Sequence, residues 1–158
     1  MYLLKQVKVE KDTIMVGRPK NEDLENLYRQ GYQRVVDIMP KALRDKGLAR
    51  KVRAAGMEYS PIPVEVCNED SCEIDEGWVL RFSKFINRND QVPMIINTDD
   101  ETLGISLVVL SNLIPEGRSF SDIIKAIQSL GISLKGRKEL KRFIRAFYDH
   151  QRRKQIAL

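Results

Sequence analysis

Histidine, tryptophan and cysteine are scarce in this chain of 158 residues, which contains one, one and two of them respectively. The two cysteines, Cys67 and Cys72, form an isolated C-x4-C, and His150 lies far away in a different kind of segment. A structural zinc site needs four ligands. The sequence therefore predicts no metal site here, and it leaves two states open for the cysteines, reduced thiols or a local disulfide.

Long hydrophobic runs are also lacking. No apolar stretch approaches the ~20 residues of a membrane span. The opening segment, MYLLKQVKVEKD, lacks the apolar stretch and the small-residue cleavage site of a signal peptide. These absences predict a cytoplasmic protein without a membrane partner. The length fits one domain over residues 1–158 with a sizeable core.

Acidic residues become rare toward the end of the chain. The segment from Lys135 to Lys154 holds nine Lys or Arg and two acids, which gives it a net charge of +7 within a chain of +5. Such a basic segment is either a solvated helix face or a surface that binds a polyanion. The polyanion would be an acidic protein partner or a nucleic acid. The side chains predicted outside its apolar stripe are Lys141, Arg142, Arg145, Arg152 and Arg153.

Hydrophobic periodicity predicts strands that alternate with helices. Alternation of apolar and polar residues predicts a hairpin within 6–19, and β-branched or proline-containing runs predict extended segments at 34–39, 57–64 and 92–97. Helical spacing predicts helices at 21–31 (with Asn21 as N-cap), 41–56, 74–86, 102–114, 119–131 and 136–154. This order predicts an α/β fold with a mainly parallel central sheet flanked by helices. Helices dominate residues 118–155 and are expected to pack on the same core.

The order of three segments resembles the cysteine-dependent protein tyrosine and dual-specificity phosphatase superfamily, especially its small members. TIMVGRPKNEDLENLYRQGYQRVVDIMP is similar to the opening strand, loop, helix and second strand of that family. GMEYSPIPV is similar to the strand that precedes its general-acid loop, and EGWVLRFSKFINRNDQVPMIIN to the helix and strand that lead into its active site. The resemblance implies a phosphatase-like fold whose site lies at the end of the strand within 92–97.

The signature of that family, H-C-x-x-G-x-x-R, is not present at this point. Aligned on the strand end, its histidine falls on Asn97, its cysteine on Thr98, its glycine on Glu101 and its arginine on Gly104. Only the backbone shape of the loop is expected to be shared. The degenerate phosphate-loop positions are Asn97, Thr98, Asp99, Asp100, Glu101, Thr102 and Gly104.

The chemistry of these replacements predicts loss of phosphotransfer. Threonine lacks the low pKa of a reactive thiolate, and glycine lacks the fork and the charge of arginine. Two like charges about 4 Å apart cost roughly 4 kcal/mol at an effective dielectric near 20, so the loop acids would repel a phosphate. We therefore expect a pseudophosphatase-like binding or scaffold protein, not an enzyme, without catalytic residues or cofactor.

Three alternatives compete with this interpretation. The sequence TDDE is also typical of a helix N-terminus with acidic first-turn residues, which needs no ligand. A nucleic-acid-associated protein could use the basic C-terminal helix. An enzyme of another class could reuse the fold, with a metal at Asp99, Asp100 and Glu101.

Overall fold

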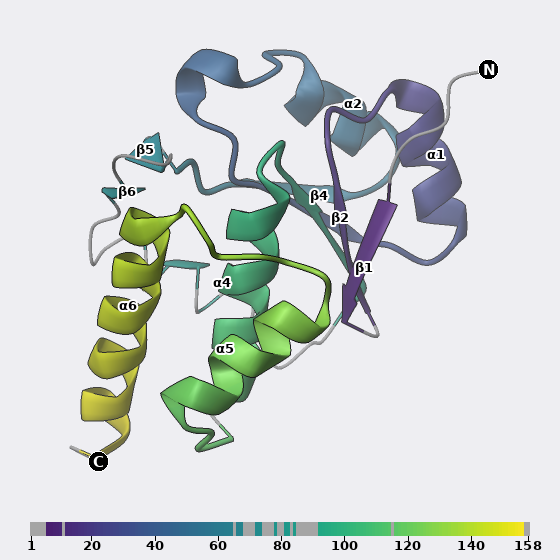
Figure 1. The fold of residues 1–158 in the computed structure, drawn as a ribbon. Coiled ribbons are helices and arrows are strands. Elements are labelled where there is room, and N and C mark those ends of the chain that lie inside the picture. Colours follow the sequence, from purple (N-terminus) through teal and green to yellow (C-terminus); the bar gives the residue numbers. More distant parts are fainter. Residues whose placement is uncertain are drawn as a thin grey trace. The chain divides into compact units, whose positions relative to one another are not determined.

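The computed structural model describes residues 6–10, 12–64, 66–67, 72–73, 78, 81–82, 84, 92–114 and 116–156 (Figure 1). The chain forms two compact units, and neither is one continuous stretch of sequence. The first comprises Met1–Glu65 and Asn89–Glu101, and the second comprises Val66–Arg88 and Thr102–Leu158. Each unit is described separately below.

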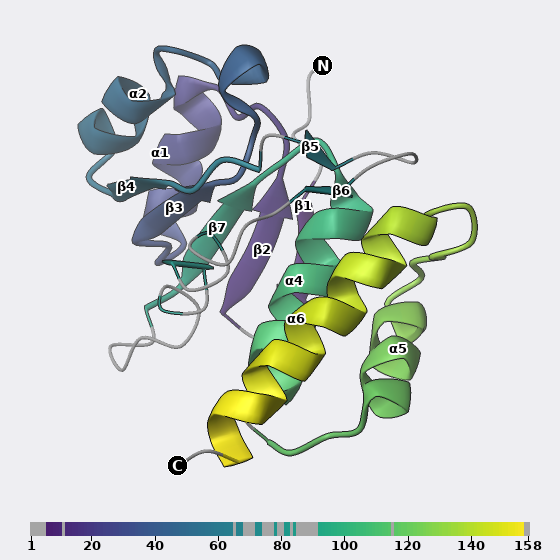
Figure 2. The same cartoon turned by 90° about the vertical axis from the view of Figure 1, so that its left-hand side faces the viewer.

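A five-stranded sheet forms the centre of the first unit (Figure 2). β1 pairs antiparallel with β2, as the predicted hairpin requires, whereas the pairs β2–β7, β7–β3 and β3–β4 are all parallel. This arrangement confirms the predicted α/β fold with a mainly parallel central sheet. In spatial order the strands are β1 Gln6–Glu10, β2 Thr13–Val16, β7 Met94–Asn97, β3 Arg34–Asp37 and β4 Glu58–Pro61.

Parallel pairing brings the carboxyl ends of β2, β7, β3 and β4 to one edge of the sheet, called the carboxyl edge below. The register places Asn97 opposite both Val16 and Asp37, and Asp37 opposite Pro61. Strands β3 and β7 are buried along their whole length, and the central residues of each strand, Val35–Val36 and Ile95–Ile96, are apolar. In open α/β sheets, ligands bind outside the carboxyl ends of the strands.

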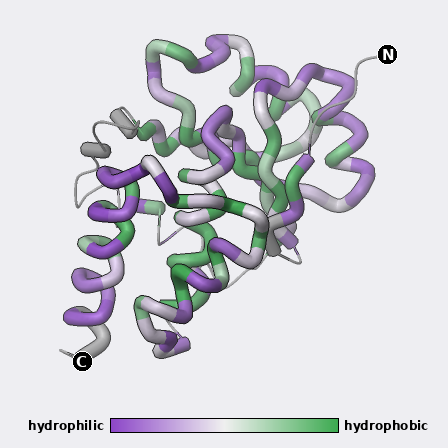
Figure 3. Tube along the Cα trace, viewed as in Figure 1, coloured by the Kyte–Doolittle hydropathy of each residue, from purple (hydrophilic) through white to green (hydrophobic). Residues whose placement is uncertain are grey.

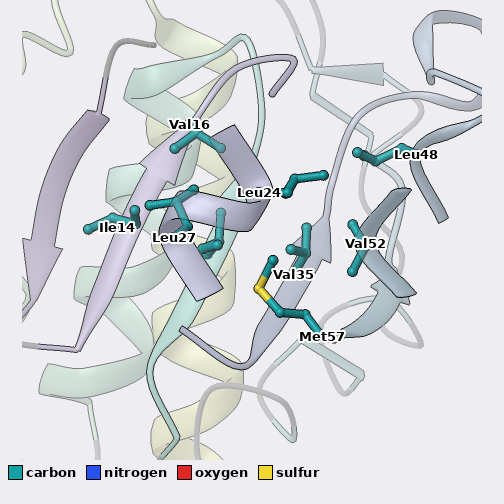
Figure 4. Packing of buried hydrophobic residues seen from close by; sticks show 9 residues of the cluster. Ile14, Val16, Leu24, Leu27, Val35, Leu48, Val52 and Met57 are labelled. Atoms are coloured by element: carbon teal, nitrogen blue, oxygen red, sulfur yellow. The ribbon is translucent and has the colours of Figure 1, made fainter. Parts of the chain in front are cut away.

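Two helices of the first unit, α1 Asn21–Arg29 and α2 Leu48–Ala54, bury their apolar faces in one hydrophobic cluster with the sheet (Figure 4). Leu24 and Leu27 of α1 and Val52 of α2 are fully buried there. Burial of each such side chain stabilises a fold by about 1.5–3 kcal/mol. The other members of the cluster are Ile14, Val16, Val35, Leu48, Met57 and Ile95.

Two sequence predictions in this unit need correction. The single helix predicted over 41–56 is a 3-10 helix, η1 Lys41–Leu43, followed by a separate α2. Asp45 accepts hydrogen bonds from the backbone of Gly47 and from Lys51, and it thereby stabilises the turn between the two pieces. The N-cap of α1 is Lys20 rather than Asn21, which is the first helical residue.

The described part of the second unit is mostly helical. Most of α4 is hydrophobic, as Figure 3 shows, and this agrees with its burial on nearly every side. Ser119 caps α5 by accepting a hydrogen bond from the backbone N–H of Asp122. The elements are β5 Val66–Cys67, β6 Cys72–Glu73, α4 Glu101–Leu113, α5 Phe120–Ser129 and α6 Lys138–Ile156, and α4 starts at the last residue of the first unit.

Aromatic side chains pack against one another within the second unit. Phe120 of α5 and Tyr148 of α6 meet edge to face with ring centroids 5.6 Å apart, and Trp78 stacks on Phe82 at 5.0 Å. Most of the helix predicted at 74–86 lies outside the described residues. Of the helices that the structure describes, none combines the length and apolar character that crossing a membrane requires.

Candidate functional site at the carboxyl edge

A buried carboxylate lies at the end of β3. The side chain of Asp37 is fully buried, and it accepts three hydrogen bonds from residues that the structure describes. Its Oδ1 accepts from the backbone N–H of Met39 at 3.1 Å and from Nδ2 of Asn97 at 3.0 Å. Its Oδ2 accepts from the hydroxyl of Tyr59 at 2.6 Å. Burying a charge is costly unless donors of this kind compensate it, so Asp37 organises this part of the edge.

Asn97 connects Asp37 to the loop after β2. While its Nδ2 donates to Asp37, its Oδ1 accepts a hydrogen bond from the backbone N–H of Arg18 at 3.1 Å. Arg18 has a φ of 51°, in the left-handed region that a side chain other than glycine rarely adopts. Such a conformation persists only where the surroundings fix it, and it is common at functional sites. The Asn97 amide therefore holds the backbone from which the Arg18 side chain extends.

The guanidinium of Arg18 pairs with the acidic loop that follows β7. Its Nε lies 2.9 Å from Oδ2 of Asp99, and the two side chains are 59% and 46% exposed. Gly17 allows the two loops to approach closely. A Cβ at this position would lie 3.2 Å from Oδ1 of Asp99 and 3.3 Å from the carbonyl oxygen of Thr98. The pair therefore presents a cation and a carboxylate together at an accessible part of the carboxyl edge.

The predicted phosphate-loop positions divide between a short loop and a helix. Asn97 ends β7, and Thr98, Asp99 and Asp100 form the loop. The side chain of Thr98 is buried, and its Oγ1 accepts a hydrogen bond from the backbone N–H of Asp100 at 3.0 Å. Glu101, Thr102 and Gly104 already belong to α4, with Glu101 in its first turn, as the helix-terminus interpretation of TDDE expects.

The three consecutive acids do not gather around a common point. Among the residues that the structure describes, no group of three or more His, Cys, Asp or Glu side chains is arranged to hold a metal ion. Asp99 is instead bound to Arg18. The geometry therefore gives no support to a metal site made by Asp99, Asp100 and Glu101.

Two further side chains border Asp37. Burial raises the pKa of Tyr59 well above its ordinary value, and the hydrogen bond to Asp37 and the charge of Asp37 raise it further. Tyr59 is therefore a neutral hydrogen-bond donor at physiological pH. Arg44, in the segment after η1, places its Nε 3.7 Å from Oδ2 of Asp37. This distance allows a Coulomb interaction but is too long for a hydrogen bond.

The predicted basic surface lies on α6 in the second unit. Four of its side chains are exposed, and Arg152 is half-buried. Two are engaged within the helix: Arg142 pairs with Glu139, and Arg145 with Asp149 at 3.3 Å. Arg145 also lies over the ring of Phe120, and Arg152 lies over that of Tyr148. The four exposed residues are Lys141, Arg142, Arg145 and Arg153.

Sequence reasoning missed four residues of the carboxyl edge, namely Arg18, Asp37, Arg44 and Tyr59. One signal for Asp37 was available, because a charged residue within the buried run RVVDIM needs compensating donors. Tyr59 carried no signal. The two arginines lie in loops, where periodicity is uninformative.

Three solved structures illustrate what this fold is similar to. A DUF442 protein from Shewanella putrefaciens CN-32, which bears a provisional phosphatase name, superimposes with a TM-score of 0.69 at 15% identity, over 91% of this chain and 87% of that one. Tk-PTP in its active form superimposes with a TM-score of 0.62 at 12% identity, over 88% of this chain and 95% of that one. A variant of P. aeruginosa TpbA in complex with pTyr superimposes with a TM-score of 0.65 at 12% identity, over 94% of this chain and 93% of that one. No protein-family model and no curated protein matches the sequence.

These similarities contradict the prediction of a pseudophosphatase-like binding or scaffold protein, because the similar structures are a protein with a provisional phosphatase name, Tk-PTP in its active form and a TpbA variant bound to pTyr. They contradict the prediction that the chain is not an enzyme on the same ground. The prediction took the loss of cysteine and arginine from the loop at 98–104 to exclude all phosphate chemistry. It overlooked cations from other segments, because Arg18 and Arg44 reach the carboxyl edge after β2 and β3. The likeness shows the fold, and this chain therefore has a phosphatase-like α/β fold.

Proposed function

We propose that this protein is a phosphatase that hydrolyses phosphate esters at the carboxyl edge, with chemistry that does not use a cysteine in the loop at 98–104. The observation that carries the proposal is the Arg18–Asp99 pair. The Nε–Oδ2 distance in this pair is 2.9 Å. The backbone of Arg18 has a positive φ, and Asn97 accepts a hydrogen bond from its N–H. The phosphatase-like fold supports the reaction class.

In this proposal Arg18 binds the phosphoryl group. A guanidinium offers paired N–H donors that match two phosphate oxygens, and its charge offsets the repulsion from Asp99. Each like-charge contact about 4 Å long costs roughly 4 kcal/mol at an effective dielectric near 20, and an attractive contact of that length returns a similar amount. The exposed fraction of Arg18, 59%, leaves it accessible to a substrate.

Asp99 is the proposed nucleophile. A carboxylate nucleophile needs no adjacent base, and aspartate forms phosphorylated intermediates in other enzymes. The hydroxyl of Thr98 is a weaker candidate, because it requires a base and its oxygen accepts the N–H of Asp100. Attack by the Asp99 carboxylate on phosphorus would break the ester P–O bond and leave an acyl phosphate. The leaving oxygen departs as an anion and takes a proton from water. A second water then hydrolyses the acyl phosphate to inorganic phosphate and regenerates the Asp99 carboxylate.

The test compares hydrolysis of an aryl phosphate and of a pTyr peptide by the full chain and three variants. Asp99→Asn should lower the rate by at least about a hundredfold, as loss of a nucleophile does, and Arg18→Met should weaken substrate binding. Thr98→Val should retain turnover. Asp149→Asn is the matched control, because it breaks an exposed Arg–Asp pair of 3.3 Å in the second unit.

Two outcomes contradict the proposal. Absence of turnover above the enzyme-free rate on every ester tested would refute phosphatase activity. Full activity in Asp99→Asn together with loss of activity in Thr98→Val would refute the assigned nucleophile. Circular dichroism of each variant shows whether the fold is retained.

Three expectations stay predictions. They are the single domain over residues 1–158, the cytoplasmic location and the partner surface on α6.

A further inference from the structure

Arg44 has hydrogen-bonding capacity that its surroundings leave unused. Its side chain is 23% exposed as a whole, but its Nε and Nη2 atoms are buried. Neither nitrogen has a hydrogen-bond acceptor among the described residues. Buried donors without acceptors are rare in folded proteins, and each one needs an explanation.

The nearest carboxylate does not satisfy these donors. Asp37 lies 3.7 Å from Nε of Arg44, and its two oxygens already accept from Met39, Asn97 and Tyr59. The guanidinium therefore receives a balancing charge from Asp37 but no hydrogen bond. Asp37 balances the charge of the cation and accepts from neither of these two buried nitrogens.

The two unsatisfied donors are of the kind that binds an oxyanion. Nε–H and one Nη–H of a guanidinium form a planar fork that matches two oxygens of a phosphate or a carboxylate. Arg44 also lies at the carboxyl edge, where ligands bind in this class of fold. The hydrogen bond from Lys51 is the main cause of the lowered pKa of the neighbouring Asp45, and the charge of Arg18 makes a small further contribution to it.

We propose that Arg44 is an oxyanion-binding site in addition to Arg18, formed by its Nε–H and Nη2–H and held in place by Asp37. Its ligand is an acidic group, phosphate or carboxylate, of the molecule bound at the carboxyl edge. The inference stands on the geometry of Arg44 alone, so it holds or fails independently of the proposed hydrolysis.

The test is a binding measurement on the unmodified full chain. Arginine Nε–H signals are followed by ¹⁵N NMR during titration with inorganic phosphate, and in a parallel arm with acetate. The Arg44 signal is identified by its loss in Arg44→Lys. It should shift saturably, whereas the signal of Arg50, an exposed residue of α2, should not. The arm with the larger shift at equal concentration identifies the ligand as a phosphoryl or a carboxyl group.

A second measurement uses matched variants. Arg44→Lys keeps the charge and loses the fork, so phosphate should bind it at least tenfold more weakly than it binds the parent, by thermal shift. Arg50→Lys should bind like the parent. An Arg44 signal that responds to neither anion would overturn the proposal. So would equal affinity in Arg44→Lys and the parent, or a response that Arg18→Lys abolishes and Arg44→Lys leaves intact.

Discussion

Tyr59 and Asp37 form a contact whose protonation can be tested by pH. The raised pKa of Tyr59 means that the folded state retains the phenolic proton at a pH where the unfolded chain, with a pKa near 10.0, has lost it. The stability that this contact contributes is therefore fully present below about pH 10 and declines as pH rises further. The pKa of Tyr32 is also raised, mainly by burial, so Tyr32 adds to the same decline in stability.

Tyr59→Phe should separate these effects. At neutral pH the variant should lose about 1–3 kcal/mol, because Oδ2 of the buried Asp37 loses its hydroxyl donor. Above pH 10 its stability should fall less steeply than that of the parent. Urea unfolding at several pH values measures both quantities. Parallel stability curves for parent and variant across the alkaline range would contradict the assigned cause.

Gly17 permits a close approach that a side chain would prevent. Gly17→Ala would place a Cβ 3.2 Å from Oδ1 of Asp99 and 3.3 Å from the backbone oxygen of Thr98, so the loop must move. We expect a loss of about 1–3 kcal/mol and a lower rate of ester hydrolysis. Gly47→Ala is the control, because its nearest neighbour is the Asp45 carboxylate at 3.4 Å. Equal stability of the two variants would contradict the crowding argument.

At the scale of elements, local sequence patterns predicted what local interactions determine. The hairpin, β3, β4, β7 and the helices α1, α4, α5 and α6 follow from periodicity and turn residues. The prediction over 41–56 was wrong because the Asp45 side chain stabilises a turn that periodicity does not detect. Three contacts at the carboxyl edge join residues far apart in sequence: Asn97 lies 60 positions from Asp37 and 79 from Arg18, and Arg18 lies 81 positions from Asp99. No local pattern records such pairings.

Helix α6 should stabilise the protein through its apolar face. Four residues of the predicted apolar stripe are buried, as expected, whereas the fifth, Tyr148, is half-buried. Ending the chain before Lys138 should therefore destabilise the fold strongly, because each lost side chain is worth about 1.5–3 kcal/mol. Thermal unfolding of the truncated and parent chains measures this. Equal melting temperatures would show that the helix adds nothing. The four residues are Leu140, Phe143, Ile144 and Phe147.

The basic face of α6 should contribute much less. Replacing Lys141, Arg142 and Arg153 with glutamine should leave the melting temperature nearly unchanged, since exposed charges add little. Replacing Arg145 and Arg152 removes two cation–π contacts and should cost about 0.5–1 kcal/mol each. If this face is the predicted polyanion surface, the first variant should also lose binding to a polyanion at low salt. Unchanged binding would leave it a solvated face.

At the scale of the whole molecule, the predicted single domain can be tested by cooperativity. Neither unit is continuous in sequence: the chain leaves the first unit after Glu65, returns at Asn89 and leaves again after Glu101, where α4 begins. This interleaving makes separate folding of either unit unfavourable, so we expect one cooperative transition, as small domains usually show.

The variant Val35→Ala tests cooperativity, because Val35 is fully buried in the hydrophobic cluster of the first unit. Truncating this side chain should lower the free energy of unfolding by about 1–3 kcal/mol. The single tryptophan, Trp78, stacks on Phe82 in the second unit, so its fluorescence reports unfolding there. In one domain, Val35→Ala lowers the urea midpoint of Trp78 fluorescence as much as that of the far-ultraviolet circular dichroism. A Trp78 midpoint that stays at the parental value while the dichroism curve splits into two steps would show two independently folding domains.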